Sequence, residues 1–300
     1  MNFCIAIVGP TGVGKSQLSQ ELALEFNAEI VNSDSLLFYR GMNIGTAKPE
    51  KFLVPHHLID CAEPTEHYDI EKFRKEALIA ISDIHNRKKN VFVVGGSGFY
   101  LRALTQGIYE VRQASQELKD DLEKEATPHL YERLHKLDSE ACITIHPNDR
   151  YRTIRALEMI LLSGKKASEI KKEFASARDK KQNLKMKYIG VNLPREELYR
   201  KINERTKKML EQGFHEEVVN LLKKYPAHTR SLQAVGYKQM IATIKKEISL
   251  AQCHDEIAQR TRQLAKRQLT WFRNQLDVNW FHPLVDRNLI YDFINKIATV

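Results

Sequence analysis

The first 26 residues combine an apolar run, a glycine-rich turn and an amphipathic segment. Residues 3–9 predict a buried strand, residues 16–26 predict a helix, and the turn between them fits the pattern G-x-x-x-x-G-K-[ST]. In such a turn the backbone N–H groups face one anion, and the helix N-terminus adds partial positive charge. We expect Lys15 to reach the outer phosphate of a diphosphate-bearing ligand and the Ser16 hydroxyl to hold Mg²⁺. The predicted phosphate-binding residues are Gly9, Pro10, Thr11, Gly12, Val13, Gly14, Lys15 and Ser16.

Strand-like and helix-like segments alternate on both sides of a helical middle region. Further strands are expected at residues 28–33, 91–95, 187–193 and 278–282, and helical stretches at 69–87, 203–223 and 254–276. This alternation predicts a parallel sheet covered by helices. Residues 113–182 show helical periods and no strong strand pattern. The predicted fold class is therefore α/β, with a P-loop NTPase-like core formed by residues 1–112 and 183–300 and a helical insertion domain at 113–182.

The charge balance favours a polyanionic partner without proving one. Lys and Arg number 47 against 38 Asp and Glu, which gives a net charge of +9. Residues 165–187 alone hold nine basic and three acidic side chains. A solvent-exposed helix face is the alternative explanation for that basic run.

Several protein classes are excluded by simple counts. The apolar runs are much shorter than the roughly 20 residues that a membrane-spanning helix needs, so no membrane partner is expected. The N-terminus lacks the pattern of a secretory or transit signal. The four cysteines, at 4, 61, 142 and 253, form no C-x-x-C pair, which predicts neither a zinc site nor a disulfide framework. A reducing cytoplasm and a monomeric chain are the expectations that fit these features.

A carboxylate follows the second predicted strand. Asp34 comes directly after residues 28–33, and ligands of open α/β sheets bind outside the carboxyl ends of the strands. It is a candidate magnesium ligand or general base, and a cap for a following helix is the alternative. The strand at 91–95 ends in Gly95 and Gly96 and carries no acid, which weakens a nucleotide-hydrolase interpretation.

An ordered series of motifs resembles the tRNA dimethylallyltransferases of the bacterial type, also called isopentenyl-tRNA or IPP transferases. The series spans almost the whole chain, from residue 9 to residue 273. Its segments are Gly9–Ser16, Asp34–Pro49, His56–Asp60, Gly95–Leu101, Pro147–Glu158, Gln233–Lys238 and Thr261–Arg273. One phosphate loop alone would be unspecific, whereas this ordered series is very specific.

The resemblance implies transfer of a dimethylallyl group from dimethylallyl diphosphate to N6 of adenosine 37 in the anticodon stem-loop of tRNA. It implies Mg²⁺ as the cofactor and substrate tRNAs that read codons beginning with U. Asp34, Lys15 and Ser97 are its implied catalytic residues, with Asp34 as the base. The implied tRNA-binding residues are Asp34, Ser35, Leu36, Leu37, Ser97, Lys119, Tyr151, Arg152, Thr153, Ile154, Arg155, Gln233, Ala234, Val235, Gly236, Tyr237, Lys238, Arg262, Lys266 and Arg267.

The chain departs from the family pattern at two positions near the expected site. Asn43 stands where the family usually has Asp, which questions a magnesium role there. Leu37 replaces a Gln found in many members, so a polar contact to tRNA is expected to be missing.

Two other functions share part of these features. A P-loop small-molecule or nucleotide kinase would share the phosphate loop, and the basic insertion could imitate its lid. A non-catalytic RNA-binding module would explain the charge but not Lys15 and Ser16 in their strand-loop-helix setting.

Overall fold

The structure, a computed structural model, describes residues 3–108, 114–177 and 184–298. The chain divides into two compact units. Residues Met1–Thr105 and Leu184–Val300 form the first, called the core unit below, and Gln106–Asn183 form the second, called the helical unit. The core unit has two hydrophobic clusters and the helical unit has one among the described residues, and each unit is described by itself.

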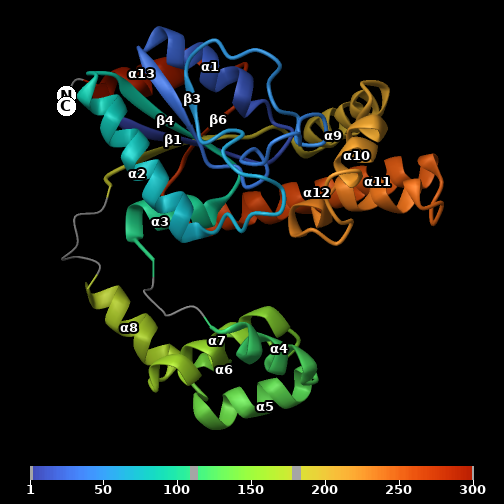
Figure 1. The fold of residues 1–300 in the computed structure, drawn as a ribbon. Helices are drawn as coiled ribbons and strands as arrows, with labels where there is room; N and C mark the ends of the chain where they lie inside the picture. Colours follow the sequence, from blue (N-terminus) through green and yellow to red (C-terminus); the bar gives the residue numbers. More distant parts are fainter. Residues whose placement is uncertain (1–2, 109–113, 178–183, 299–300) are drawn as a thin grey trace. The chain divides into compact units, whose positions relative to one another are not determined.

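A parallel six-stranded sheet forms the centre of the core unit (Figure 1), in the order β3-β2-β4-β1-β5-β6. Its strands are β1 (Cys4–Val8), β2 (Ala28–Asn32), β3 (His56–His57), β4 (Asn90–Gly95), β5 (Lys187–Val191) and β6 (Asn279–Phe281). Alternate side chains of β1 enter two different clusters, with Ala6 in one and Ile5 in the other. Burial on both faces explains why these strands read as continuous apolar runs in the sequence.

Helices cover both faces of this sheet. Residues of α1, α9 and α13 pack in one cluster, and residues of α2, α3, α10 and α11 pack in the other. The helices of the core unit are α1 (Lys15–Glu25), α2 (Ile70–Asn86), α3 (Gly98–Gln106), α9 (Arg195–Glu211), α10 (Phe214–Leu222), α11 (Tyr237–Ile244), α12 (Leu250–Gln275) and α13 (Arg287–Ala298), with a 3₁₀ turn η2 (Arg230–Gln233). None of the helices among the described residues is long and apolar enough to cross a membrane.

The predicted α/β class and parallel sheet are confirmed, with two local differences. The two-residue strand β3 is too short to leave a periodic pattern, and the sequence analysis missed it. The helical stretch predicted at 203–223 is wrong as one piece, because α9 ends at Glu211 and α10 begins after Gly213. Gly213 has φ of 94°, a left-handed conformation that interrupts a helix and that glycine adopts without strain.

The helical unit contains α4 (Gln116–Lys124), α5 (Thr127–Leu137), α6 (Ala141–Thr144), α7 (Arg150–Ser163) and α8 (Ala167–Ala177). Its cluster includes Leu130, Leu134 and Leu157. The buried carboxylate of Asp138 accepts hydrogen bonds from the Ser168 hydroxyl at 2.8 Å and from the backbone N–H of Ala141 at 3.1 Å. This carboxylate therefore joins the start of α8 to the segment that precedes α6.

Candidate active site

The phosphate loop runs from the end of β1 to the start of α1. Gly9 has φ of 150°, and a Cβ atom there would lie 2.2 Å from the carbonyl oxygen of Val191, so this position excludes a side chain. The Lys15 Nζ atom donates hydrogen bonds to the carbonyl oxygens of Gly9 and Pro10, both at 2.9 Å. Burial, with a smaller contribution from Arg205, lowers the pKa of Lys15 to about 8, while Asp34 opposes the shift. Ser16 is exposed in the first turn of α1.

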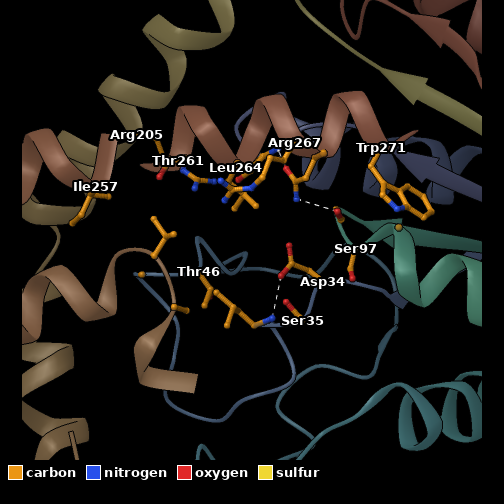
Figure 2. A pocket seen from close by; sticks show the side chains of 18 of the residues that line it. Asp34, Ser35, Thr46, Ser97, Arg205, Ile257, Thr261, Leu264, Arg267 and Trp271 are labelled. Atoms are coloured by element: carbon orange, nitrogen blue, oxygen red, sulfur yellow. Dashed lines mark hydrogen bonds between the residues drawn. The ribbon is translucent and has the colours of Figure 1, made fainter. Parts of the chain in front are cut away.

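Two cavities meet beside this loop. The phosphate-loop cavity has a volume of about 220 Å³ and is lined by residues that include Lys15 and Ser16. The second, called the α12 cavity, has a volume of about 500 Å³ and lies among the loops after β2 and β4 and helix α12 (Figure 2). Four residues line both cavities: Thr11, Asp34, Thr46 and Arg205. A ligand that enters one cavity can therefore meet a ligand held in the other.

Asp34 is the only acidic side chain among the described residues that line either cavity. Its backbone N–H donates to the Asn32 side-chain oxygen at 2.8 Å, and its Oδ1 atom accepts from the backbone N–H of Leu36 at 3.1 Å. A turn follows Asp34 rather than a helix, so the helix-cap alternative is wrong and the carboxylate instead stabilises a turn. These bonds orient the carboxylate in the α12 cavity, which Ser97 also lines (Figure 2).

Gln268 joins the two loops that flank the cavities. Its side-chain oxygen accepts from the backbone N–H of Thr11 at 2.8 Å, and its Nε2 atom donates to the Gly96 carbonyl at 3.0 Å. Gly96 immediately precedes Ser97, which lines the α12 cavity. Gln268 is not among the site residues predicted from the sequence, because the cations dominate the pattern of the run 261–273.

The cationic side chains near the cavities have different surroundings. Arg205 lines both cavities, and burial lowers its pKa, although Asp34 opposes the shift. Arg205 is not among the site residues predicted from the sequence, since nothing in the spacing of α9 distinguishes it from neighbouring cations. Arg267 lines the α12 cavity, whereas Arg262 donates to the Asn203 side-chain oxygen at 2.6 Å and so joins α12 to α9. Lys266 is exposed on α12.

The segment from Gln233 to Lys238 lines the α12 cavity with Ala234 and Val235 and not with Tyr237. Lys238 is exposed. Tyr237 is fully buried, and its hydroxyl donates to Glu217 at 2.7 Å. A direct tRNA contact by the Tyr237 side chain is therefore wrong for this structure, because the ring lies in the core. Gly236 precedes it with φ of 98°, and the exposed Gln233 side chain donates to the Ala227 carbonyl at 2.7 Å.

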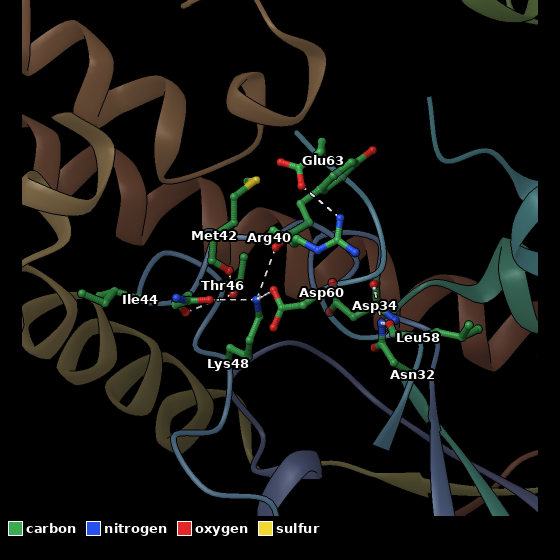
Figure 3. A network of polar contacts seen from close by, with 12 residues as sticks. Asn32, Asp34, Arg40, Met42, Ile44, Thr46, Lys48, Leu58, Asp60 and Glu63 are labelled. Carbon is green, nitrogen blue, oxygen red and sulfur yellow. Dashed lines mark hydrogen bonds and ion pairs between the residues drawn. The ribbon is translucent and has the colours of Figure 1, made fainter. Parts of the chain in front are cut away.

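The loop that contains Asn43 is held by side chains on both sides. Glu217 accepts hydrogen bonds from the backbone N–H groups of Asn43, Ile44 and Gly45, at 3.0, 2.6 and 3.1 Å. The buried Lys48 Nζ atom donates to Asn43 at 2.8 Å and to Asp60 at 2.5 Å (Figure 3). Asn43 thus belongs to this network and does not line either cavity.

The residues after Asp34 divide between the two cavities. Ser35 and Leu36 line the α12 cavity, whereas Leu37 lines the phosphate-loop cavity. An apolar side chain at position 37 therefore forms part of the wall of the phosphate-loop cavity. This placement does not support the expectation that position 37 faces tRNA.

The predicted tRNA-binding residues of the helical unit lie on α4 and α7. Tyr151, Arg152 and Arg155 are exposed on α7, where Arg152 pairs with Asp149 at 3.3 Å and Arg155 with Glu158 at 2.7 Å. Thr153 and Ile154 are buried and pack inside the unit, so the predicted tRNA contact of this segment depends on its exposed side chains and its backbone. Lys119 is half-buried on α4.

The chain is similar to known proteins over most of its length. The model of the IPP transferase family matches residues 37–275. The chain is 42% identical to tRNA dimethylallyltransferase 2 of Geotalea uraniireducens over 284 residues, which cover 92% of this chain and 91% of the relative. It is 39% identical to the tRNA dimethylallyltransferase of Geobacter sulfurreducens, with 98% of this chain and 95% of the relative covered.

Solved structures give the same result. The tRNA delta(2)-isopentenylpyrophosphate transferase of Staphylococcus epidermidis superposes with a TM-score of 0.71 at 36% identity, covering 99% of this chain and 100% of that chain. A eukaryotic dimethylallyltransferase acting on tRNA superposes with a TM-score of 0.83 at 31% identity, covering 99% of this chain and 80% of that chain. These likenesses confirm the P-loop NTPase-like core and the resemblance drawn from the motifs. The chain belongs to the IPP transferase family.

Proposed function

We propose that the protein transfers a dimethylallyl group from dimethylallyl diphosphate to N6 of adenosine 37 in tRNAs that read codons beginning with U. Diphosphate is the second product. The observation that carries this proposal is the position of Asp34, the one carboxylate among the described residues lining the phosphate-loop cavity and the α12 cavity. A base at that junction serves a reaction between a diphosphate-bearing donor and an acceptor that arrive from different sides.

The phosphate-loop cavity suits the donor. Its backbone N–H groups and Lys15 face the diphosphate, and Arg205 brings a second cation to the same cavity. As the allylic C–O bond breaks, negative charge grows on the leaving diphosphate, and these groups stabilise it. Leu37 and Ala47 give the same cavity an apolar wall for the hydrocarbon part of the donor.

The α12 cavity suits the acceptor base. A base stacked in RNA is out of reach of a catalytic group, so the target adenosine has to turn out into a pocket. N6 of adenine is a poor nucleophile because its lone pair is delocalised into the ring. Asp34 accepts the N6 proton while the nitrogen attacks the allylic carbon, and Ser97, which lines the same cavity, helps to hold the base.

The oxygen donors present fit Mg²⁺. The Ser16 hydroxyl and the Asp34 carboxylate line one cavity, and Mg²⁺ prefers a few protein oxygens together with phosphate oxygens and water. Ser16 would hold the ion, with Asp34 beside it. Mg²⁺ supplies neutralisation of the diphosphate charge when bound.

We assign tRNA contacts to exposed side chains in both units. In the helical unit these are Tyr151, Arg152 and Arg155, with Lys119 as a further cation. In the core unit they are Lys238, Lys266 and Arg267 beside the small residues of the 233–236 segment. We also propose that the protein acts as a monomer in the cytoplasm, where its proposed tRNA substrate resides.

The kinase alternative is less well supported. β4 ends in glycine rather than in an acid that would support a nucleotide-bound Mg²⁺, and the relatives are named as tRNA dimethylallyltransferases. ATP in place of the prenyl donor nevertheless makes a useful control.

The test is mass analysis of an unmodified anticodon stem-loop with adenosines at positions 36, 37 and 38, after incubation with the protein, Mg²⁺ and dimethylallyl diphosphate. The expected result is a gain of one dimethylallyl group on adenosine 37. Asp34→Asn should lower turnover by about 10²–10⁴-fold while stem-loop binding is retained. Asp255→Asn, at an exposed acid on α12, is the matched control. Phosphate transfer from ATP without prenyl transfer would support the kinase instead.

A further inference from the structure

An exposed aromatic side chain lies beside Ser97 in the α12 cavity. Phe99 is 49% exposed and therefore adds little to the core. Its ring centroid is 5.8 Å from that of Trp271, and the Arg102 guanidinium carbon is 5.0 Å from the Phe99 centroid. We call Phe99, Arg102 and Trp271 the Phe99 platform.

The start of α3 is built to keep this platform in place. A Cβ atom at Gly98 would lie 2.0 Å from the Trp271 ring, so α3 approaches α12 closely only because position 98 has no side chain. Ser97 and Phe99 are two residues apart, so their Cα atoms lie within about 7.6 Å of each other. A group held at Phe99 is therefore a near neighbour of a base held at Ser97.

We propose that the Phe99 platform binds the nucleobase that flanks the target adenosine in the RNA, by stacking of that base on the Phe99 ring. Stacking on exposed aromatic rings is a general way to hold unpaired bases, and it tolerates any base. Arg102 holds one side of the ring by a cation–π contact, and its positive charge beside the ring suits a backbone phosphate of the flanking nucleotide.

The position of Phe99 favours RNA over the prenyl donor as its ligand. Phe99 lines the α12 cavity and not the phosphate-loop cavity, where the donor diphosphate is proposed to lie. The neighbouring Arg102 and Arg267 suit a polyanion and would add nothing to the binding of a hydrocarbon chain. This inference rests on the proposed function, because it takes the α12 cavity as the acceptor site.

The experiment measures binding of an anticodon stem-loop in the absence of donor, with 2-aminopurine at one or the other position flanking the target adenosine. Phe99→Ala should weaken stem-loop binding by about tenfold. In the unchanged protein, binding should quench the fluorescence of 2-aminopurine at one of the two flanking positions. Phe99→Ala should abolish this quenching. Phe99→Tyr keeps a stacking ring and should keep both signals. Phe52→Ala, which removes a ring with 44% exposure outside both cavities, is the matched control and should change neither.

Two results would overturn the inference. In the first, the Phe99→Ala variant binds the stem-loop and quenches 2-aminopurine within twofold of the unchanged protein. The other is a raised KM for dimethylallyl diphosphate with unchanged RNA binding, which would place Phe99 at the donor. Absence of prenyl transfer in the unchanged protein would count against the proposed function alone, because the binding assay contains no donor.

Discussion

The side-chain oxygen of Gln268 accepts a hydrogen bond from the backbone N–H of Thr11 at 2.8 Å, across 257 positions of the chain. The other end of the same amide donates to the Gly96 carbonyl at 3.0 Å. One side chain of α12 therefore sets the distance between the phosphate loop and the loop that carries Ser97. Under the proposed function, these loops hold the donor and the acceptor.

Gln268→Met should lower kcat for prenyl transfer by tenfold or more. Methionine has a similar length but makes neither hydrogen bond, and misplacement of reacting groups by about 1 Å can cost on the order of 10²-fold in rate. Initial rates with both substrates varied would measure the effect. Gln259→Met, at an exposed position of the same helix, is the control. Rates within twofold of the unchanged protein would contradict a positioning role for Gln268.

Lys15 should make diphosphate binding depend on pH. The pKa of Lys15 in the free protein is lowered to about 8, and only its charged form attracts the anion. Affinity for inorganic pyrophosphate should therefore fall as pH rises from about 7 to about 9, by up to roughly tenfold per unit above the pKa. Titration calorimetry across this range measures the effect. Lys15→Arg retains its charge over this range, so its pyrophosphate affinity should show only the ligand's own pH dependence. Identical pH profiles of affinity for Lys15→Arg and the unchanged protein would refute the assignment of the pH dependence to Lys15.

Tyr237 should matter for stability and not for RNA contact. Its buried hydroxyl donates to Glu217, so Tyr237→Phe should lower the free energy of unfolding by about 1–2 kcal/mol. Stem-loop affinity should stay within twofold. Urea denaturation and gel-shift titration measure the two quantities. Tyr151→Phe, at a side chain with 74% exposure, should leave stability within about 0.5 kcal/mol. A large loss of RNA affinity in Tyr237→Phe with unchanged stability would restore the direct-contact prediction.

Glu29 should make the core unit sensitive to acid. Hydrogen bonding to Arg87, assisted by His57 and Lys89, lowers the pKa of the buried Glu29 to about 2 from 4.5. Because the pKa of Glu29 is lower in the folded protein, the charged carboxylate stabilises the fold above pH 4.5. The fold loses this stabilisation as the pH falls toward 2. The expected loss is on the order of 2–3 kcal/mol in the free energy of unfolding.

Chemical denaturation at a series of pH values tests this expectation. Glu29→Gln should be less stable at neutral pH and should lack this part of the acid dependence. Glu50→Gln, at an exposed acid, should behave as the unchanged protein. The same pH profile in Glu29→Gln and in the unchanged protein would show that Glu29 is not the group responsible.

Much of the core unit was predictable because local patterns determine it. Burial of the sheet on both faces requires runs such as Val91–Val94, and such runs are visible without knowledge of their neighbours. The break at Gly213 and the strand β3 were not predictable in the same way. A glycine in a helical pattern is ambiguous until its φ is known, and β3 depends on its pairing with β2.

The sequence by itself determined the phosphate loop and the carboxylate after β2, since each depends on residues close together in the chain. It also determined the family, since the order of the motifs along the chain is visible without the structure. Only the tertiary structure decided that Arg205 and Gln268 join that site and that Tyr237 leaves it. The physical reason is that helical periodicity shows which side chains share a face, whereas packing determines which face turns toward the sheet. Asp34 and Ser97 come to line one cavity in the same way, because β2 and β4 are neighbours in the sheet although 57 residues lie between the end of β2 and the start of β4.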